Sequence, residues 1–327
     1  MSEQTTRRFR FGVSATAPNL ESAATLRSFA RKAEDLGFST LLMGDHMGRS
    51  LAPLLALQFA AGATTRLRVS PQVIANDFRN PALLAKEVAT IDLLTEGRFE
   101  LGIGTGWPAG SPNAIADYAQ LGIELDEAGP RVSRLFESVQ IIKAFLASDE
   151  PVSFSGSYYN IQGLVPAPRP VQHPRPPIMV AGAGPRILRL CAREVDIINL
   201  APRPPIVGRT ARGSQGFGLT MADTVAIVRE AAAERYGDIE LCVFANNPES
   251  GNPSITDNPE PLIDKLAAEM NTTREAIMDM PATMIGSVDE MVDRLQRERT
   301  QYDISYRVIP SYAMDAFAPV VVRLAGT

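Results

Sequence analysis

FRFGVSATAPNLESAATLRSFARKAEDLGFSTLLM, residues 9–43, is the stretch whose pattern the rest of the chain repeats. The run Phe9–Ala15 is short and apolar, as is typical of a buried strand. Over residues 22–36 apolar side chains recur at helical spacing, and Gly37 follows as the residue that ends the helix. A second apolar run, Thr40–Met43, predicts the next strand. A strand, a helix and a strand in this order indicate a βαβ unit of a parallel sheet.

The same alternation continues to the end of the chain. Further strands are predicted at Leu67–Ile74, Phe99–Ile103, Ile178–Ala181, Asp196–Leu200, Glu240–Ala245 and Ser305–Ile309, and further helices at 52–62, 81–94, 131–147, 185–192, 221–236, 288–300 and 313–325. Eight strands and eight helices favour an α/β fold, a (β/α)8 TIM barrel that forms a single domain over residues 1–327. The alternative is an open, doubly wound sheet, but Ser14–Asn19 lacks the glycine-rich turn usual after its first strand.

Segments rich in proline, glycine and polar residues interrupt this rhythm at 148–177, 201–220 and 246–282, the last with a short helix expected after Pro259. Long loops in a compact fold are commonly lids or binding loops, and disorder is the competing interpretation. In a TIM barrel we expect them as insertions at the C-terminal face, where they cover an active site. Together with 108–130 they would then set the substrate.

Composition excludes several classes of function. The net charge of the 327-residue chain is −5, with basic and acidic side chains interspersed, which disfavours a nucleic-acid partner. No run approaches the ~18 apolar residues of a membrane helix, and the polar segment Met1–Arg10 leads into no signal peptide. Cys191 and Cys242 lie far apart and indicate buried thiols in a reducing compartment. We therefore expect a cytoplasmic protein with no membrane partner and no metal site.

The clearest candidate for proton transfer is Asp45-His46, directly after the second predicted strand. A histidine beside a carboxylate at the C-terminal end of a barrel strand suits acid–base catalysis near neutral pH. The competing interpretation is a core histidine satisfied by backbone groups. The second of the two histidines, His173, lies among prolines and is expected in a loop.

Two glycine-rich strand ends are candidate ligand sites. Gly104-Thr105-Gly106 follows the fourth strand, and glycine lets the backbone approach a ligand closely. Gly182-Ala183-Gly184 opens a helix after the fifth strand, where free N–H groups suit a phosphate. Tight turns need glycine for steric reasons too, so neither stretch decides alone. Trp107, the one tryptophan, is a candidate wall of the substrate pocket, or packs under a loop.

Motifs for a nucleophilic serine, a P-loop or a zinc protease are missing from the sequence. Scarcity of catalytic side chains indicates that a cofactor carries the difficult chemistry while the barrel positions it.

The sequence also resembles a known family. ARKAEDLGFSTLLMGDH (30–46), LALQFAAGATTRLRVSPQVIANDFRNPALLAKEVATIDLLTEGRFELGIGTGW (55–107), PAPRPVQHPRPPIMVAGAGPRILRLCAREVDIINL (166–200) and IGSVDEMVDRLQRERTQYDISYRVI (285–309) resemble the bacterial luciferase-like superfamily of flavin and deazaflavin oxidoreductases. Within it they are most similar to the branch that uses coenzyme F420. The resemblance covers nearly the whole chain in order.

This resemblance implies a set of site residues. It implies that Asp45 and His46 lie near the cofactor ring, and that Gln72-Val73 is a strand bulge, often with a cis peptide, that supports the ring, with Ala75 following. It further implies that Gly104, Thr105 and Gly106 flank the ring, and that Gly182, Ala183 and Gly184 bind the phosphate. Two positions depart from the family pattern. Trp107 stands where deazaflavin sugar dehydrogenases have glutamate, which argues against sugar-phosphate oxidation, and Gln72 stands where serine is frequent.

The resemblance favours hydride transfer between coenzyme F420 and a small organic substrate, with reduction of a C=C or C=N bond and His46 as proton donor or acceptor. One alternative is an FMN-dependent monooxygenase that receives reduced flavin from a separate cofactor reductase. Another is a noncatalytic flavin-binding homologue. A homodimer is the assembly that the resemblance favours.

Overall fold

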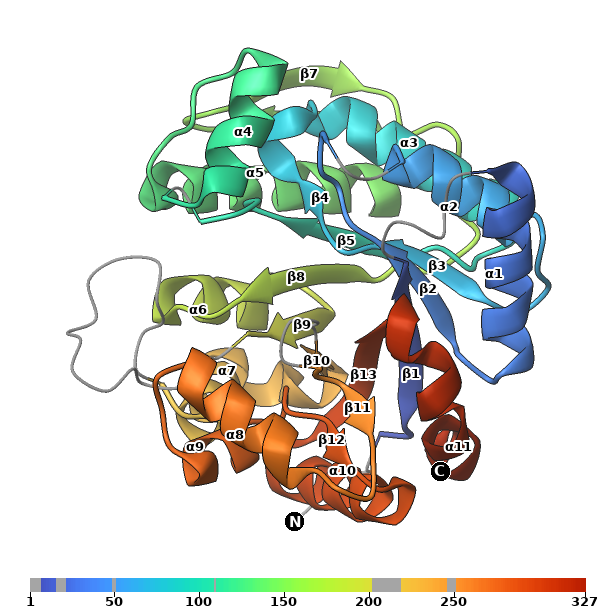
Figure 1. The fold of residues 1–327 in the computed structure, drawn as a ribbon. Helices are drawn as coiled ribbons and strands as arrows, with labels where there is room; N and C mark the ends of the chain where they lie inside the picture. The colour runs from blue at the N-terminus through green and yellow to red at the C-terminus, as the bar shows by residue number, and fades with distance from the viewer. Residues whose placement is uncertain (1–6, 16–21, 49–50, 109, 202–218, 246–250) are drawn as a thin grey trace. The chain divides into compact units, whose positions relative to one another are not determined.

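The computed structural model describes residues 7–15, 22–48, 51–108, 110–201, 219–245 and 251–327, drawn in colour in Figure 1. Their contacts cluster into two compact units. The first unit comprises 1–16, 31–40 and 182–327, and the second comprises 17–30 and 41–181. Most of the predicted loop 201–220 and the beginning of 246–282 lie outside the described residues, as does the first part of Met1–Arg10. The single-domain assignment stays a prediction.

The first unit contains the two ends of the chain. Its elements are β1 (Arg10–Ala15), the end of α1 (Ala23–Asp35), α6 (Pro185–Glu194), β9 (Ile197–Leu200), α7 (Met221–Ala232), η2 (Ala233–Asp238), β10 (Glu240–Phe244), β11 (Ser254–Ile255), α8 (Glu260–Glu269), α9 (Arg274–Met278), β12 (Ile285–Gly286), α10 (Val288–Tyr302), β13 (Ile304–Pro310), η3 (Ser311–Ala313) and α11 (Met314–Leu324). In its sheet, β13 lies between β1 and β10, and β10 pairs with β9, all in parallel (Figure 1).

The second unit holds most of the predicted site. Its elements are the beginning of α1, β2 (Thr40–Met43), α2 (Pro53–Ala61), β3 (Arg68–Pro71), β4 (Ile74–Ala75), η1 (Asn76–Phe78), α3 (Pro81–Leu94), β5 (Leu101–Gly104), α4 (Pro112–Leu121), α5 (Ala128–Ala147), β6 (Val152–Ser155), β7 (Asn160–Leu164) and β8 (Ile178–Gly182). Here β3 neighbours β2, and β5 pairs in parallel with both β4 and β8.

The predicted α/β fold class, a (β/α)8 TIM barrel, is confirmed. The described strands include one parallel sheet of nine, which are the eight predicted strands with the third divided in two. The first strand pairs with the last, from Arg10 opposite Tyr306 to Ser14 opposite Pro310. This pairing is the closure expected of a barrel, and the doubly wound alternative is therefore wrong. Strands such as β2 and β13 are buried along their whole length, as parallel barrel strands are.

The third strand breaks at Gln72 and Val73, whose peptide bond is cis, as the family resemblance implied. Two differences from the prediction concern the loops. Within 108–130 the structure has a helix, α4, which ends at Gly122 with a φ of 66°. Within 148–177 the antiparallel pair β6–β7 forms a hairpin, so this segment is not irregular throughout. The helix expected after Pro259 is present as α8.

Local sequence explains where the helices around the site begin. Asn80 Oδ1 accepts the N–H groups of Ala82 and Leu83, and Pro81 occupies the first turn of α3. Ser111 Oγ accepts the N–H of Ala114 at 3.1 Å and starts α4 in the same way. These caps fix the points at which the chain leaves β4 and β5 and enters a helix.

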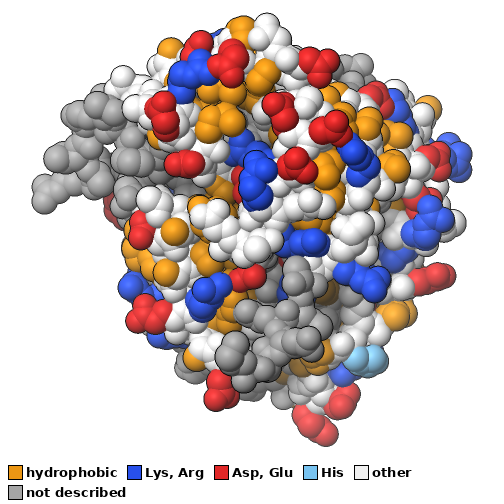
Figure 2. Space-filling model, turned by 90° about the horizontal axis from the view of Figure 1, so that it is seen from below, with side chains coloured by type: hydrophobic (Ala, Val, Ile, Leu, Met, Phe, Trp, Pro, Cys, Tyr) orange, Lys and Arg blue, Asp and Glu red, His pale blue; other side chains and the backbone are white. Residues whose placement is uncertain are grey.

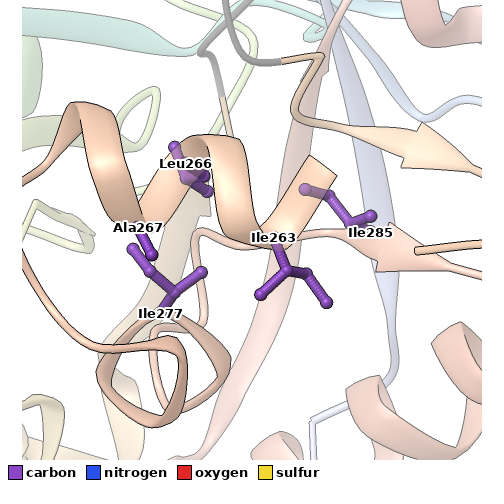
Figure 3. Close-up of a cluster of buried hydrophobic side chains, with 5 residues drawn as sticks. All are labelled: Ile263, Leu266, Ala267, Ile277 and Ile285. Atoms are coloured by element: carbon purple, nitrogen blue, oxygen red, sulfur yellow. The ribbon is translucent and has the colours of Figure 1, made fainter. Parts of the chain in front are cut away.

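Apolar burial is distributed over more than one cluster. In the first unit, side chains from α8, α9 and β12 form a small core of their own (Figure 3): Ile263, Leu266, Ala267, Ile277 and Ile285. Both cysteines are buried, as predicted, and burial raises the pKa of the Cys191 thiol. On the face shown in Figure 2, basic and acidic side chains are interspersed. Among the described residues, no helix is both long enough and apolar enough to cross a membrane.

Candidate functional site

The centre of the candidate site is a pair of stacked rings, His46 and Trp107. Their centroids lie 5.1 Å apart with 27° between the ring planes. Trp107 Nε1–H donates a hydrogen bond to His46 Nδ1 at 3.0 Å. Trp107 and the His46 side chain are each 38% exposed, so both rings are accessible. An accessible imidazole with a directed partner is suited to exchanging protons with a ligand.

The carboxylate beside this imidazole belongs to Asp117 on α4. Asp117 Oδ2 lies 3.4 Å from His46 Nδ1, and Oδ1 accepts the N–H of Met47 at 3.1 Å. The Asp117 side chain is only 10% exposed. Asp117 was not among the predicted site residues, because α4, which brings a position 71 residues away to the end of β2, was not predicted.

Asp45, the sequence neighbour of His46, is engaged elsewhere. Arg79 donates two hydrogen bonds to the Asp45 carboxylate, from Nη1 to Oδ2 and from Nη2 to Oδ1. The Ala75 N–H donates a third, to Oδ2, at 3.1 Å. The charge of Arg79 also acts on a second carboxyl group, that of Glu87: burial raises the pKa of Glu87, and Arg79 opposes that shift. A buried carboxylate held by three donors ties the end of β2 to β4 and η1. This bonding favours a positioning role for Asp45 over proton transfer, which stays a prediction.

Behind Trp107 lies a buried charged cluster around Asp77, which we call the Asp77 cluster. Asp77 Oδ2 lies 3.0 Å from Arg134 Nη1 and 3.8 Å from Arg131 Nε, and it accepts the Tyr118 hydroxyl at 2.8 Å. Arg131, 2% exposed, donates Nη2 to the carbonyls of Thr105 and Trp107. Burial and the bond to Asp77 raise the pKa of Tyr118. The cluster thus holds the Gly-Thr-Gly-Trp backbone from behind.

Glycine is required in this backbone by close packing. A Cβ on Gly102 would lie 1.9 Å from the carbonyl oxygen of Pro71, and one on Gly104 would lie 2.7 Å from Val73 Cγ2. Gly106 has a φ of +73°. The glycines therefore let β5 approach the broken strand β3–β4. Steric need accounts for them without a ligand.

Gln72 differs from its neighbours, because both polar atoms of its carboxamide are buried and have no hydrogen-bond partner. Buried amide groups normally find partners, and an orphaned one marks a place where a ligand group is expected. Its main-chain N–H is used, donating to the Met43 carbonyl at 2.7 Å. The side chain is thus the available donor and acceptor at the cis peptide.

Gly182, Ala183 and Gly184 belong to the other unit, from β8 to the beginning of α6. Gly184 is the N-cap of α6 and offers no side-chain cap, while Pro185 occupies the first turn. A Cβ on Gly182 would meet Ile187 Cγ2 at 2.8 Å, so packing alone demands glycine there. Phosphate binding at this helix start stays a prediction.

The structure therefore gathers in one unit the predicted residues His46, Asp45, Gln72, Val73, Ala75, Gly104, Thr105, Gly106 and Trp107. It adds four that the sequence analysis missed: Asp77, Arg79, Asp117 and Arg131. Asp77 could have been identified from the sequence, because it is a carboxylate just after the end of a barrel strand. Among the described residues, no group of three or more metal-ligating side chains is clustered.

Comparison with known proteins adds a family assignment. The family described as luciferase-like monooxygenase matches residues 5–302. An F420-dependent glucose-6-phosphate dehydrogenase of Kineococcus radiotolerans is 35% identical over 179 residues, 52% of this chain and 50% of that protein. An F420-dependent hydroxymycolic acid dehydrogenase of Mycobacterium tuberculosis is 26% identical over 82% of this chain and 76% of its own length.

Among solved structures, the coenzyme F420-dependent tetrahydromethanopterin reductase of Methanopyrus kandleri superimposes with a TM-score of 0.71 at 18% identity. The match covers 97% of this chain and 100% of that one, and it supports the fold. The chain spans about half the length of the first curated relatives that it matches.

Proposed function

We propose, from the premise that this chain belongs to the luciferase-like monooxygenase family, that it is an F420-dependent oxidoreductase acting on a small organic molecule. The observation that carries the proposal is the accessible His46–Trp107 pair, which lies in the same unit as the orphaned Gln72 carboxamide. Relatives whose names state F420 dependence support the choice of cofactor.

The residues present fit a deazaflavin ring. A buried carboxamide with an unpartnered donor and acceptor, as at Gln72, suits the alternating N–H and C=O groups on the pyrimidine edge of such a ring. Val73, Ala75 and the segment Gly104–Gly106 would line the ring. Considered by itself, the uncapped start of α6 at Gly182–Gly184 in the other unit is suited to a phosphate. When bound in its reduced form, F420 supplies a hydride.

Reduction of a C=C or C=N bond needs a proton as well as a hydride, and we assign the proton to His46. Its half-exposed imidazole can deliver a proton to the substrate atom that becomes electron-rich. Trp107 contributes an apolar wall where the relatives that oxidise sugars, by the resemblance described above, have a carboxylate. An apolar wall with a single proton source favours an unsaturated, uncharged substrate over a sugar phosphate.

Cofactor affinity tests the proposal directly. Purified protein is titrated with F420 and with FMN, and the quenching of Trp107, the one tryptophan, reports binding. We expect tighter binding of F420. Tight FMN binding without F420 binding would instead favour the flavin monooxygenase, which takes reduced flavin from a separate reductase.

Turnover separates an enzyme from a noncatalytic homologue. With reduced F420, cyclohex-2-en-1-one serves as the C=C probe and 2-methyl-1-pyrroline as the C=N probe. We expect His46→Ala to lower turnover by a factor of about 10²–10⁴, as for loss of a general acid. His173→Gln is the matched control, because His173 is exposed in the proline-rich segment. Equal turnover of His46→Ala and wild type would remove His46 from the mechanism.

A homodimer is part of the proposal. Leucine side chains on α2 and α3 are exposed, with Leu55 at 76% and Leu83 at 56%. Exposed apolar side chains on adjacent helices are typical of a protein interface. Native mass spectrometry of wild type and Leu55→Glu tests it, and a monomeric wild type would contradict it.

A further inference from the structure

Two groups compete for one nitrogen of His46. Nδ1 lies 3.0 Å from the Trp107 indole nitrogen and 3.4 Å from Asp117 Oδ2. An indole N–H can only donate, and an ionised carboxylate can only accept. Nδ1 can therefore bond to Trp107 only when it carries no proton, and to Asp117 only when it does. The two bonds exclude each other.

The orientation of the ring supports this competition. The opposite edge faces Gly44, where a Cβ would lie 3.2 Å from His46 Cδ2 and 3.3 Å from Nε2. Turning the ring over would place the Cδ2 carbon against the indole N–H and the carboxylate, and neither would then have a partner in the ring. The donor and the acceptor together thus fix Nδ1 on their side.

Each partner selects a different proton state. With Trp107 bonded to Nδ1, neutral imidazole carries its proton on Nε2, and Nε2 cannot accept another. With Asp117 bonded to Nδ1–H, Nε2 of the neutral imidazole carries no proton, so it can accept one and return it as imidazolium. Only the second arrangement lets Nε2 work as base and acid in turn, since the first could donate only by forming an unfavourable imidazolate.

We propose that Asp117 and Trp107 are positioning residues that switch His46 between a resting tautomer and a proton-transferring one. Trp107 holds the resting tautomer, with the proton on Nε2. Asp117 holds Nδ1–H during proton transfer, and its second oxygen fixes its place by accepting the Met47 N–H at 3.1 Å. The consequence for turnover rests on the function proposed above, whereas the tautomer is a property of the protein without cofactor.

The two anchors of the switch are themselves held firmly. Arg131 Nη2 binds the Trp107 carbonyl at 2.9 Å, and Asp117 is 7% exposed within α4. The His46 side chain is 38% exposed, and its Nδ1 already lies 3.0 Å from the indole nitrogen and 3.4 Å from Asp117 Oδ2. A small rotation of the imidazole ring therefore suffices to exchange one bond for the other.

Nitrogen-15 NMR tests the switch, because the chain has two histidines and one tryptophan. His173→Gln identifies the His46 resonances, and the single indole N–H signal is that of Trp107. In the wild-type protein, at a pH where His46 is neutral, we expect Nδ1 to show the unprotonated form. A wild-type protein with Nδ1 protonated at that pH would overturn the proposal.

Variants separate the two partners. Trp107→Phe keeps a stacked ring without the N–H, and we expect the neutral His46 proton to move to Nδ1. Asp117→Asn keeps an oxygen for Met47 N–H but offers Nδ1 an amide donor, so we expect the Nε2-protonated tautomer to be locked. Unchanged His46 tautomers in Trp107→Phe would contradict the proposed role of the indole. Circular dichroism spectra that match the wild type confirm that each variant is folded.

Turnover of the enone or imine probe completes the test. We expect Asp117→Asn to lower kcat by about 10²–10⁴ while KM changes little, because proton transfer and not binding is impaired. Asp315→Asn, a control with its carboxylate 68% exposed, keeps the wild-type kcat. Wild-type kcat in Asp117→Asn would overturn the positioning role and leave the proposed function intact. Failure of the wild type to bind F420 would instead overturn the proposed function and leave the NMR result standing.

Discussion

Two buried clusters in this molecule have the same composition, an arginine on each side of one carboxylate. In the second unit, Asp77 lies between Arg131 and Arg134. In the first, Glu298 accepts Arg294 Nε at 2.8 Å and lies 2.7 Å from Arg307 Nη2, and we call this the Glu298 cluster. In both clusters, one arginine is at most 2% exposed and also donates to main-chain carbonyls.

The clusters differ in the residues to which those main-chain carbonyls belong. Arg131 holds the carbonyls of Thr105 and Trp107, and Trp107 in turn donates to His46. In the Glu298 cluster, Arg294 donates to the carbonyls of Met278 and Met280, and Arg307 donates to that of Pro281. A buried ion pair is therefore weak evidence of a functional site by itself. What distinguishes the Asp77 cluster is that it holds Trp107, whose indole donates to the accessible imidazole of His46.

The largest expected effect tests that distinction. Asp77→Ala leaves the buried Arg131 without its carboxylate, and Glu298→Ala does the same to the buried Arg294 and Arg307. We expect each change to lower the free energy of unfolding by about 3–5 kcal/mol. Only Asp77→Ala should also change the native fluorescence of Trp107 and weaken F420 binding. Denaturant titration followed by circular dichroism measures the first quantity. A Glu298→Ala protein with altered Trp107 emission would break the comparison.

A smaller effect is expected from two matched tyrosines. Tyr118 and Tyr236 each donate a hydroxyl hydrogen bond of 2.8 Å to a carboxylate, Asp77 and Asp303 respectively. Replacing either tyrosine by Phe should cost about 1.5–3 kcal/mol, as for hydrogen bonds to charged groups. Tyr118→Phe alone should change the Trp107 emission, and equal emission in the two variants would contradict this.

The same pair gives a prediction for alkaline pH. Burial raises the pKa of Tyr236 from 10.0 to about 12. The folded state therefore holds this proton more tightly, so the contribution to stability is fully present below pH 10 and is lost as the pH rises through about 12. Unfolding titrations between these pH values should show a shallower loss of stability in Tyr236→Phe than in wild type.

The smallest expected effect concerns helix caps. Ser111 begins α4, which carries Asp117 and Tyr118, and Ser287 begins α10, which carries Arg294 and Glu298. Alanine at either cap should cost about 1 kcal/mol. Only Ser111→Ala should disturb the His46 tautomer, measured by NMR. A changed tautomer in Ser287→Ala would show that the two regions are not separable.

The cap of α10 also gives a prediction for acidic pH. The N–H and hydroxyl of Ser287 hold the pKa of Glu290 below its usual 4.5. This contribution to stability is present above pH 4.5 and is lost as the pH falls through the lowered pKa. Ser287→Ala should therefore flatten the acid dependence of unfolding, and an unchanged slope would contradict the assignment.

Much of the fold was predictable because its signals are local. Predicted runs such as Thr40–Met43 and 81–94 coincide with β2 and α3. The reason is that the spacing of apolar residues and the residues that cap a helix are features of each short segment. The helix α4 was missed because 108–130 was treated as a loop before the helix predicted at 131–147. The hairpin β6–β7 was missed because 148–177 was treated as one proline-rich loop, although most of its prolines follow the hairpin.

The site was predictable only in part. His46, Trp107 and the glycines after β5 stand at strand ends, a position that a parallel barrel makes informative. Asp45 was paired with His46 because they are adjacent in sequence, yet in the structure the Asp45 carboxylate is hydrogen-bonded to Arg79 and to the Ala75 N–H. Adjacent residues of an extended segment point to opposite sides, so sequence adjacency does not make side chains partners.

The sequence alone determined the parallel α/β barrel, the strand ends that carry the site and the family, because periodicity, glycine placement and motif order are properties of short stretches. Only the tertiary structure decided that Asp117 is the carboxylate beside His46, that Trp107 donates to Nδ1 and that Arg131 binds the Trp107 carbonyl. The physical reason is that a hydrogen bond depends on distance in space, and residues 61 and 71 positions from His46 meet it only after the barrel has folded.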